Sequence, residues 1–331
     1  MKNVILTGVG GFIGSHCLEY FLEKTNWNII GIDSFRHKGT YSRLNEVSNY
    51  SIDRVKIYHH DLSVPIDEQL QKQLDKIDYI INMASDSAVE RSTSDPVACL
   101  RNNSDLAINM LELARKLKPE IFFHISTDEV YGDAKIGESH KEWSTILPSN
   151  PYSASKAAQE AYAYSYWRTF GVPVVITNTM NNIGEWQDCE KFLPKLIRLI
   201  ATGQEMPIYA DSEKEIGTRF YLHAKNHADA LVFLSKRPPA LYENGADRPD
   251  RYNVCGDVEL NNLEFAQLVA KLMNKPLKYK LVKSESARKG YDRRYALDGG
   301  KMRDLGWVPP IGFEESLEKI IKWTLDNPHW I

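Results

Sequence analysis

The sequence has few cysteines and no long hydrophobic run. Its four cysteines, Cys17, Cys99, Cys189 and Cys255, are scattered along 331 residues and form no C-x-x-C pair. This distribution argues against a disulfide framework and a structural zinc site, and it fits a reducing cytoplasm. No stretch approaches the run of about 20 apolar residues that a membrane-spanning helix requires. We therefore expect a cytoplasmic protein that holds no metal, whose apolar start leads into a glycine loop and not into a signal-peptide cleavage site.

The sequence also has little net charge. Its 41 basic and 44 acidic residues give a formal net charge of −3, which provides no basic surface for nucleic acid. The hydrophobic fraction of 43% and the charged fraction of 26% are typical of a globular protein. A chain of this length is long enough for a large α/β domain and a second lobe. We therefore expect neither a nucleic-acid partner nor a membrane partner.

Short apolar segments alternate with segments of helical periodicity through the first half of the chain. The segments that we expect to be strands are 3–8, 28–33, 54–60, 79–84, 121–126 and 172–178. Several are apolar throughout, as strands are in a parallel sheet that is covered on both faces. Helical patterns such as 12–24 and 103–117 lie between them. This alternation predicts the α/β class, with a Rossmann-type doubly wound parallel sheet.

The pattern changes after residue 180, where loops become longer and the alternation is less regular. Here we expect a short strand at 251–256 and helices at 192–203, 262–275 and 317–327. We read this half as a smaller α/β lobe that covers the carboxyl edge of the sheet and binds substrate. The predicted division is a Rossmann domain at 1–180 to which 218–256 returns, and a C-terminal lobe made of 181–217 and 257–331.

A glycine-rich loop follows the first predicted strand. TGVGGFIGSH places Gly8, Gly11 and Gly14 at G-x-x-G-x-x-G spacing. Glycine there permits a tight turn and lets backbone N–H groups approach a pyrophosphate at the start of a helix. The second predicted strand ends at Asp33, 19 residues after Gly14, where a carboxylate can bind ribose hydroxyls. Because that charge repels a 2′-phosphate, the pattern favours NAD over NADP.

The residues that follow bear on the same cofactor. Arg36 and Lys38 come directly after the acid and leave NADP open as an alternative. The segment HHDL at 59–62 can place Asp61 and Leu62 against an adenine ring. A plain turn at the end of a strand is the alternative interpretation of HHDL.

A second motif combines a phenol with an amine. In NPYSASKAAQE, Tyr152 and Lys156 stand at i and i+4 on one face of a helix that Pro151 begins. An ammonium group held near a phenol favours the phenolate. A tyrosine in that state can act as a base near neutral pH.

Acidic side chains end one of the predicted strands. The apolar segment 121–126 leads into Thr127, Asp128 and Glu129 within HISTDEVYGD. Strand alternation would turn the two adjacent acids in different directions, so the strand must end before them if they are to act together. Beside a dinucleotide loop and a Tyr-x-x-x-Lys helix, this acidic pair is a candidate for acid–base chemistry.

These motifs together resemble the extended short-chain dehydrogenase/reductase superfamily. More narrowly, STDEVYGD, NPYSASKAAQE, NNIGEWQDCEKFLPKLI and DRRYALDGGKMRDLGW resemble the nucleotide-sugar 4,6-dehydratases, and the resemblance covers nearly the whole chain. It implies a hydro-lyase with tightly bound NAD. Its substrate would be a nucleoside diphosphate hexose of the dTDP-glucose or UDP-glucose type, converted to the 4-keto-6-deoxyhexose.

The resemblance also implies catalytic roles. Tyr152, helped by Lys156, would take the proton from the sugar 4-hydroxyl while C4 gives hydride to NAD. Glu129 would remove the C5 proton and Asp128 would protonate the departing 6-hydroxyl, after which hydride returns to C6. Thr127 would hydrogen-bond the C4 oxygen. The elimination needs one protonated and one ionised carboxyl, and close carboxyls can have pKa values that differ in this way.

Binding residues and an assembly follow from the same resemblance. The implied cofactor-binding residues are Gly8, Gly11, Phe12, Ile13, Gly14, Asp33, Ser34, Asp61, Leu62, Ala84, Asn103, Tyr152, Lys156 and Asn182. The implied substrate-binding residues are Ser87, Asn181, Glu190, Lys191, Arg219, Asn253, Arg288 and Arg293. The implied assembly is a homodimer in which the helices near Asn103 and Tyr152 form a four-helix bundle.

Several positions depart from the family pattern. MASDSAVERS has Ala88 where the pattern has histidine, and NNIGE has Glu185 where the pattern has proline. These changes surround the sugar and the nucleotide, so the base and the hexose stay open, with UDP-N-acetylglucosamine among the candidates. A C4 epimerase or a decarboxylase of the same superfamily is one alternative, against which Asp128 argues. A nonenzymatic NAD-binding protein is another, against which Tyr152 and Lys156 argue.

Overall fold

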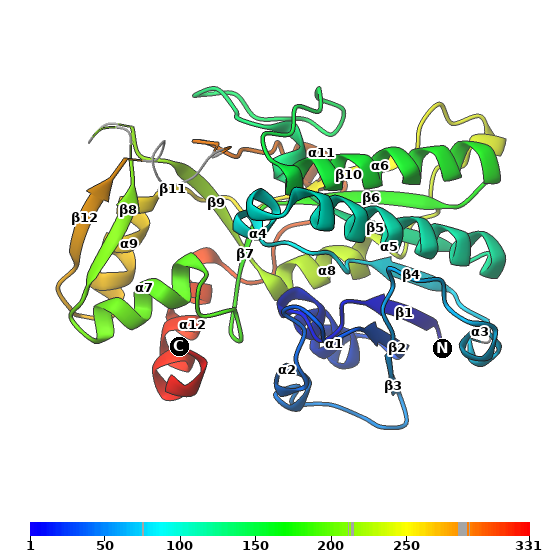
Figure 1. Cartoon of the computed structure of the whole chain (residues 1–331), viewed down its shortest axis with the longest axis horizontal. Helices are drawn as coiled ribbons and strands as arrows, with labels where there is room; N and C mark the ends of the chain where they lie inside the picture. Colours follow the sequence, from blue (N-terminus) through cyan, green and yellow to red (C-terminus); the bar gives the residue numbers. More distant parts are fainter. Residues whose placement is uncertain (75, 211, 213–214, 284–289, 291) are drawn as a thin grey trace.

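The protein is built around a seven-stranded parallel sheet with helices on both faces (Figure 1). The computed structural model describes residues 1–74, 76–210, 212, 215–283, 290 and 292–331. The strand order is β10-β6-β5-β4-β1-β2-β3. From β1 the chain adds β2 and β3 on one side and then β4 to β6 on the other, as in a doubly wound sheet. The strands are β1 (Asn3–Thr7), β2 (Asn28–Asp33), β3 (Val55–His59), β4 (Tyr79–Asn82), β5 (Ile121–Thr127), β6 (Val174–Thr179) and β10 (Asp250–Val254).

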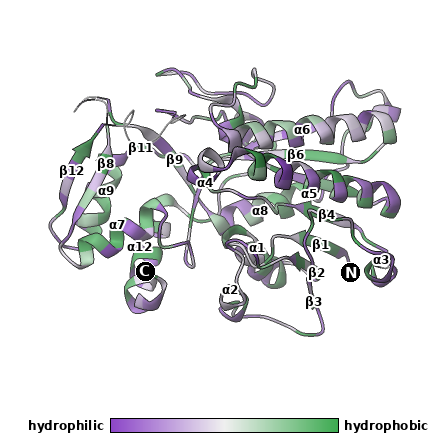
Figure 2. Cartoon of the chain, in the orientation of Figure 1, coloured by the Kyte–Doolittle hydropathy of each residue, from purple (hydrophilic) through white to green (hydrophobic). Residues whose placement is uncertain are grey.

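The predicted fold class is confirmed, and the predicted strands of the first half lie within two residues of the observed ones. The strands are apolar on both sides because helices cover both (Figure 2). On one face α1 (Phe12–Lys24) and α8 (Ala224–Leu234) pack over alternate strand residues. On the other face lie α3 (Glu68–Gln73), α5 (Pro96–Leu117) and α6 (Pro151–Phe170).

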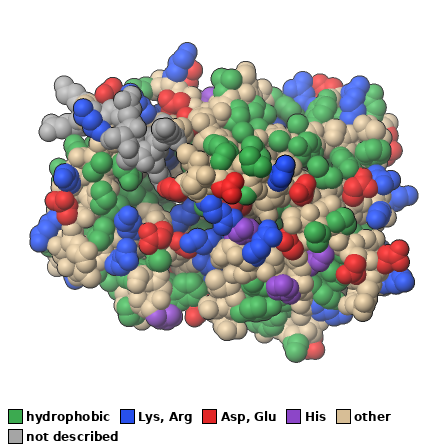
Figure 3. All heavy atoms as spheres, viewed as in Figure 1, with side chains coloured by type: hydrophobic (Ala, Val, Ile, Leu, Met, Phe, Trp, Pro, Cys, Tyr) green, Lys and Arg blue, Asp and Glu red, His purple; other side chains and the backbone are tan. Residues whose placement is uncertain are grey.

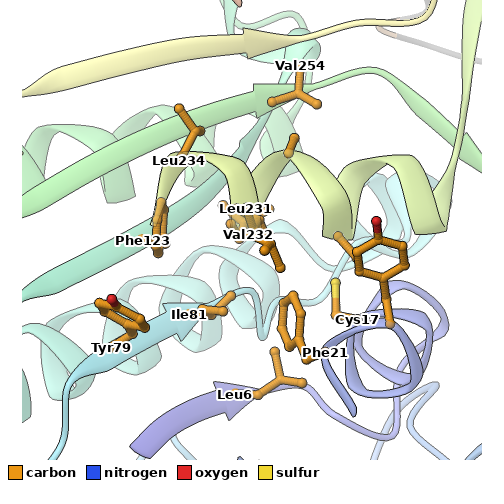
Figure 4. Close-up of a cluster of buried hydrophobic side chains, with 14 of the residues drawn as sticks. Leu6, Cys17, Phe21, Tyr79, Ile81, Phe123, Leu231, Val232, Leu234 and Val254 are labelled. Carbon is orange, nitrogen blue, oxygen red and sulfur yellow. The ribbon is translucent and has the colours of Figure 1, made fainter. Parts of the chain in front are cut away.

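Alternation along each strand divides the core into two layers. Figure 4 shows Leu231 of α8 and Phe21 of α1 over the strand residues Ile81 and Phe123. The neighbours Ile80 and Phe122 point to the opposite face and belong to the layer under α5 and α6. All of these side chains are almost completely buried, and each contributes roughly 1.5–3 kcal/mol through removal of apolar surface from water.

Local signals begin and end the helix that contains the Tyr-x-x-x-Lys motif. Asn150 caps α6 by accepting the amide of Ser153, whose side chain in turn accepts the amide of Asn150. Pro151 occupies the first turn, and Gly171 ends the helix in a left-handed conformation. This cap fixes the entry of the chain into α6, one residue before Tyr152.

Among the described residues, the C-terminal lobe is built mainly of two small sheets and the helices that pack on them. One sheet contains β7 (Asn181–Ile183), β9 (Thr218–His223) and β11 (Glu259–Asn261), and the other pairs β8 (Glu205–Tyr209) with β12 (Lys278–Val282). The helices α7 (Phe192–Ala201), α9 (Asn262–Leu272) and α12 (Phe313–Asp326) share a separate apolar core. The helices predicted after residue 180 are confirmed, and the strand predicted at 251–256 is β10.

Short elements complete the described chain. They are α2 (Tyr41–Asn45), α4 (Val89–Ser94), α11 (Gly300–Asp304) and the 3-10 helices η1 (Asp128–Tyr131), η2 (Tyr242–Asn244) and η3 (Pro328–Trp330). In the part of the chain that the structure describes, none of the helices has both the length and the apolar character needed to cross a membrane. All four cysteines are free, and three of them are buried.

Candidate active site

Two hollows lie beside the carboxyl ends of the central strands and continue into one another. The strand-end hollow, of about 370 Å³, is lined by the glycine loop and by residues that follow β2, β4, β5 and β6. The lobe hollow, of about 870 Å³, extends between these strand ends and the C-terminal lobe. Glu129, Asn181, Asn182 and Lys191 line both. Figure 3 shows basic and acidic side chains gathered around the centre of this face.

The glycine loop forms one wall of the strand-end hollow. Gly8 has φ +69°, which favours glycine, and a Cβ at Gly14 would lie 2.1 Å from the Gly8 carbonyl oxygen. Helix and strand therefore approach more closely than any side chain would allow. The loop leads into α1, whose first N–H groups have no partner within the helix and point toward an anion site. This cradle fits the pyrophosphate of a dinucleotide.

The carboxylate of Asp33 lies at the end of β2 beside the loop. Its two oxygens accept the backbone N–H groups of Gly10, at 2.9 Å, and Phe35, at 2.8 Å. It also lines the strand-end hollow, together with Ser34, Asp61 and Leu62. A fixed negative charge at this position suits ribose hydroxyls and opposes a 2′-phosphate.

The two cations that left NADP open are both engaged by carboxylates. Arg36 forms an ion pair with Asp61 and donates to the Asn102 side chain at 2.7 Å. Lys38 lies 2.7 Å from a carboxylate oxygen of Asp188. Neither side chain is therefore held ready for a 2′-phosphate, which strengthens the preference for NAD.

The acidic pair comes immediately after β5, as its proposed chemistry requires. The strand ends at Thr127, and η1 begins at Asp128, so strand alternation no longer separates the two acids. The Thr127 hydroxyl donates to Asp128 Oδ1 at 3.0 Å and accepts the Glu129 amide at 3.3 Å. One threonine thus orients both acids.

The two acids have different surroundings. Asp128 is 4% exposed, and burial, followed by the charge of Glu129, raises the pKa of its carboxyl to about 7. Burial also raises the pKa of Glu129, while the amide of Asn150 lowers it. Glu129 reaches both hollows, and Asp128 lies behind the surface of both. At neutral pH the site can therefore contain one protonated and one ionised carboxyl.

Sequence reasoning missed two partners of Glu129. The Asn150 amide donates to Glu129 Oε2 at 3.3 Å, and the Tyr295 hydroxyl donates to the same oxygen at 3.4 Å. The guanidinium of Arg219 lies over the Tyr295 ring, 4.2 Å from its centroid. Both residues fall inside motifs that carried the family resemblance, NPYSASK and DRRY, which was the one signal that could have identified them.

Tyr152 and Lys156 lie on α6 and line the strand-end hollow, but the expected effect of the amine on the phenol is absent. Lys156 Nζ donates to the Ile125 carbonyl and to the Gln159 side chain, both at 2.7 Å. Burial lowers the pKa of Lys156 to about 8. Burial, together with the two acids of η1, raises the pKa of Tyr152 instead of lowering it. The prediction that Lys156 favours the phenolate therefore stays a prediction, and burial and the two acids oppose it in the chain alone.

Most of the implied cofactor residues line the strand-end hollow. They are Gly8, Gly11, Phe12, Ile13, Gly14, Asp33, Ser34, Asp61, Leu62, Ala84, Tyr152, Lys156 and Asn182. Asn103 lies behind the hollow and is fully buried. Its side chain accepts the amide of Asp86 at 2.8 Å and donates to Ser155 Oγ at 2.8 Å, so it supports the wall that Asp86 lines.

The implied substrate residues divide into two groups. Ser87 lines the strand-end hollow, Glu190 and Arg219 line the lobe hollow, and Asn181 and Lys191 line both. The guanidinium of Arg219 donates to backbone carbonyls, including that of Asp292 at 2.8 Å.

Asn253 and Arg293 line neither hollow. Asn253 is buried and donates to the carbonyls of His140, at 2.9 Å, and Asp298, at 3.2 Å, away from both hollows. Arg293 lies 3.3 Å from Glu215, and both side chains are exposed. Arg288 lies outside the described residues.

Comparison with known proteins identifies the family. The model of the GDP-mannose 4,6 dehydratase family matches residues 5–320. A dTDP-glucose 4,6-dehydratase of Haemophilus influenzae is 35% identical, over 99% of this chain and 99% of its own. One from Salmonella typhimurium is 31% identical, over 99% and 94%.

Solved structures agree. DesIV, a dTDP-glucose 4,6-dehydratase of Streptomyces venezuelae crystallised with NAD and TYD, has a TM-score of 0.86 and 29% identity, over 100% of this chain and 98% of its own. A UDP-N-acetylglucosamine 4-epimerase of Methanobrevibacter ruminantium, with a TM-score of 0.83, 24% identity and 98% coverage of both chains, shares the fold. The family match and the full-length relatives, which agree with the geometry of the two hollows, show that this chain belongs to the GDP-mannose 4,6 dehydratase family.

Proposed function

We propose that this chain is an NAD-dependent nucleotide-sugar 4,6-dehydratase. It converts a nucleoside diphosphate hexose to the 4-keto-6-deoxy product and releases one water. The observation that carries this proposal is the acidic pair at the end of β5. Asp128 and Glu129 are adjacent and share Thr127 as a partner. Burial raises the pKa of both carboxyls, and the amide of Asn150 favours the ionised form of Glu129.

The residues of the strand-end hollow fit NAD. The glycine loop would hold the pyrophosphate, Asp33 the adenosine ribose, and Leu62 the adenine. When bound, NAD supplies the reversible hydride acceptor. Tyr152 and Lys156 lie in the same hollow, so the reacting sugar and the cofactor would meet there.

Tyr152 is the residue that would take the proton from the sugar 4-hydroxyl. The phenol lies within hydrogen-bonding reach of Thr127, which would hold the C4 oxygen in the same place. Lys156, with a pKa lowered to about 8 and two fixed acceptors, stabilises the site by orientation and by its charge. Oxidation at C4 acidifies the C5 proton, which prepares the elimination.

Glu129 would remove the C5 proton. Both of its recorded donors, Asn150 and Tyr295, bond to Oε2, which leaves Oε1 available as the base. Asp128, with a pKa raised to about 7, would carry the proton that the departing 6-hydroxyl needs. A C4 epimerase or a decarboxylase breaks no C6–O bond and has no use for this proton donor.

The lobe hollow would bind the nucleoside diphosphate. Lys191 and Arg219 offer cations for the phosphates, and Glu190 lies beside them. Tyr209 and Tyr221 supply flat apolar walls on the side of the lobe. Ala88 lines both hollows, so the histidine that the family pattern has there is replaced by open room beside the sugar.

Mass spectrometry of purified protein with a panel of nucleoside diphosphate hexoses tests the proposed function. No cofactor is added, because hydride leaves and returns within one turnover. Loss of one water from a panel member, with no net NADH, is the expected result. An unchanged mass for every member, together with a rearranged sugar in the proton NMR spectrum, would identify an epimerase instead.

We further propose a homodimer formed through α5 and α6, which pack against one another in the subunit and have exposed apolar residues such as Val97 and Phe170. Light scattering after size exclusion tests this. The division into a domain at 1–180 with 218–256 and a lobe at 181–217 and 257–331 also stays a proposal, although β9 at its boundary pairs with β7 and β11 of the lobe. So does a cytoplasmic location, with which four free cysteines are compatible.

A further inference from the structure

Three side chains from separate elements meet where the central sheet joins the C-terminal lobe. His16 lies on α1, Glu185 follows β7, and His223 ends β9, and their ligand atoms all lie within 4.8 Å of one another. His16 Nε2 and His223 Nε2 are each 3.3 Å from the same oxygen, Glu185 Oε2. The imidazoles are buried, and the Glu185 side chain is 17% exposed. Two nitrogens and one carboxylate oxygen therefore converge on a point that solvent can reach from one side.

The hydrogen bonds of a neutral His16 ring place two acceptor atoms against one another in this cluster. His16 Nδ1 lies 3.1 Å from the carbonyl oxygen of Phe12, which can only accept, so the ring proton is on Nδ1. Nε2 then presents its lone pair to Glu185 Oε2, which is also an acceptor. Two acceptors in contact repel one another unless a proton or a metal ion lies between them. A ring N–H bonded to a backbone carbonyl is also the arrangement that orients metal-binding histidines.

The distances within the cluster match those between metal ligands. A charge-assisted hydrogen bond between nitrogen and oxygen is about 2.7–2.9 Å long. Two ligands at about 2.0–2.1 Å from a tetrahedral zinc ion are about 3.3 Å apart. The distances from His16 Nε2 and His223 Nε2 to Glu185 Oε2 are both 3.3 Å, the separation of two zinc ligands.

The backbone around Glu185 is held in an unusual conformation. Trp186, the next residue, has φ +61°, which aromatic residues rarely adopt. Its carbonyl accepts from Arg43 at 2.8 Å, and its ring lies 4.5 Å from that of His16. On the other side a Cβ at Gly184 would come within 2.9 Å of His16 Nε2, so glycine preserves room beside the lone pair. These contacts aim Glu185 at the two imidazoles.

We propose that His16, Glu185 and His223 bind one divalent transition-metal ion of the zinc type. Two histidines and one glutamate are a common zinc ligand set, with a fourth position left for water. The ion would tie the helix that follows the glycine loop to β7 and β9, the strands of the C-terminal lobe that Figure 1 shows next to the central sheet. The three side chains line neither hollow, so the ion is structural and does not touch substrate. The sequence alone predicted no metal site.

Binding through His223 has a specific consequence. Its Nδ1 accepts the backbone amide of Lys225 at 3.0 Å, which leaves the ring proton on Nε2, facing Glu185. Coordination through Nε2 moves that proton to Nδ1 and ends the contact with Lys225. Metal loading should therefore change the protonation pattern of the His223 ring, which long-range proton–nitrogen NMR of labelled histidines records.

Cobalt binding to the tag-free, full-length protein tests the proposal. Wild type, Glu185→Gln and the control His329→Gln are stripped with a chelator, freed of it and titrated with Co²⁺, whose visible bands report tetrahedral coordination. Glu185→Gln should fold, because glutamine has nearly the shape of glutamate and its amide oxygen can still accept from His223. His329 is exposed and distant in sequence from the cluster. NAD binding by each variant verifies its fold.

Wild type and His329→Gln should each bind one Co²⁺ per chain with tetrahedral bands, and Glu185→Gln should bind at least about 100-fold more weakly. Zinc should raise the melting temperature of the first two only. Failure of stripped wild type to take up one equivalent, or equal binding by Glu185→Gln, would overturn the proposal and leave a shared proton in the cluster. Should Glu185→Gln misfold, the stoichiometry and bands of wild type decide the question. None of these measurements depends on turnover, so they are independent of the proposed function.

Discussion

Replacing Asp128 by asparagine removes a carboxyl group whose charged form is disfavoured by burial. The Asp128 carboxyl is buried, its Oδ2 has no recorded partner among the described residues, and its pKa is raised from 3.8 to about 7. A raised carboxyl pKa means that the folded state favours the protonated form. Wild type therefore loses stability as the pH rises from the unfolded pKa of 3.8 to the folded value near 7. Asp128→Asn has no proton to lose and escapes this loss.

The size of the effect follows from the shift. One pKa unit corresponds to about 1.36 kcal/mol, so the whole transition costs wild type about 4 kcal/mol. Between pH 5 and pH 9 wild type should lose roughly 2.7 kcal/mol of stability through this group, because the loss ends near pH 7. With an unfolding entropy of about 2.1 cal/mol/K per residue, this corresponds to a change of about 4 °C in melting temperature for a chain of this length.

Thermal unfolding of wild type and Asp128→Asn at pH 5 and pH 9 measures this pH-dependent difference in stability. The quantity of interest is the change with pH in the difference between their melting temperatures, because the constant cost of burying an amide cancels. The difference should move by about 4 °C in favour of Asp128→Asn at pH 9. An exposed control, Asp53→Asn, should show no such change. A difference that is independent of pH would refute the argument that Asp128 is protonated at neutral pH, and with it the assignment of Asp128 as the acid.

Three other substitutions test separate parts of the structure. Tyr152→Phe should lower turnover by about 10²–10⁴-fold and still bind NAD by calorimetry, since the phenol acts on a proton; an unchanged rate would remove its assigned role. Glu160→Gln breaks a buried ion pair with Arg251 and should destabilise the fold by about 3–5 kcal/mol in denaturant melts, whereas Glu112→Gln, in an exposed pair, should cost less than about 1 kcal/mol. Gly14→Ala places a Cβ 2.1 Å from a loop carbonyl and should abolish NAD binding by calorimetry; retained affinity would contradict the cradle.

The sequence predicted the central sheet closely because each strand is an apolar run whose ends are marked by polar or glycine residues. Covering both faces with helices makes such runs long and continuous, so β1 to β6 could be located within two residues. The glycine loop, Asp33 and the residues from Thr127 to Glu129 come together because parallel strands end at one edge. Their convergence follows from topology and needs no knowledge of side-chain contacts.

Long-range polar pairing was beyond sequence reasoning. Asn253 was expected to bind substrate, yet it lies under the site, where it satisfies two backbone carbonyls. Glu185 was recognised as a departure from the family pattern, but its partners His16 and His223 are 169 and 38 residues away in the sequence. No spacing rule relates positions on different elements, because their meeting depends on how the lobe packs against the sheet.

The acidic pair and much of the wall of the lobe hollow belong to different packing units of the protein. Thr127, Asp128 and Glu129 follow β5, and their geometry is set by the central sheet and by the cap of α6. The side of the lobe hollow that includes Leu193, Met206 and Tyr221 belongs to other sheets and a separate apolar core. Substitutions in that wall change what fits without moving the acids, because the two sets of residues belong to different packing units. The substrate of this enzyme is therefore to be sought by varying the base and the hexose, whereas the loss of water from C5 and C6 should be common to every substrate it accepts.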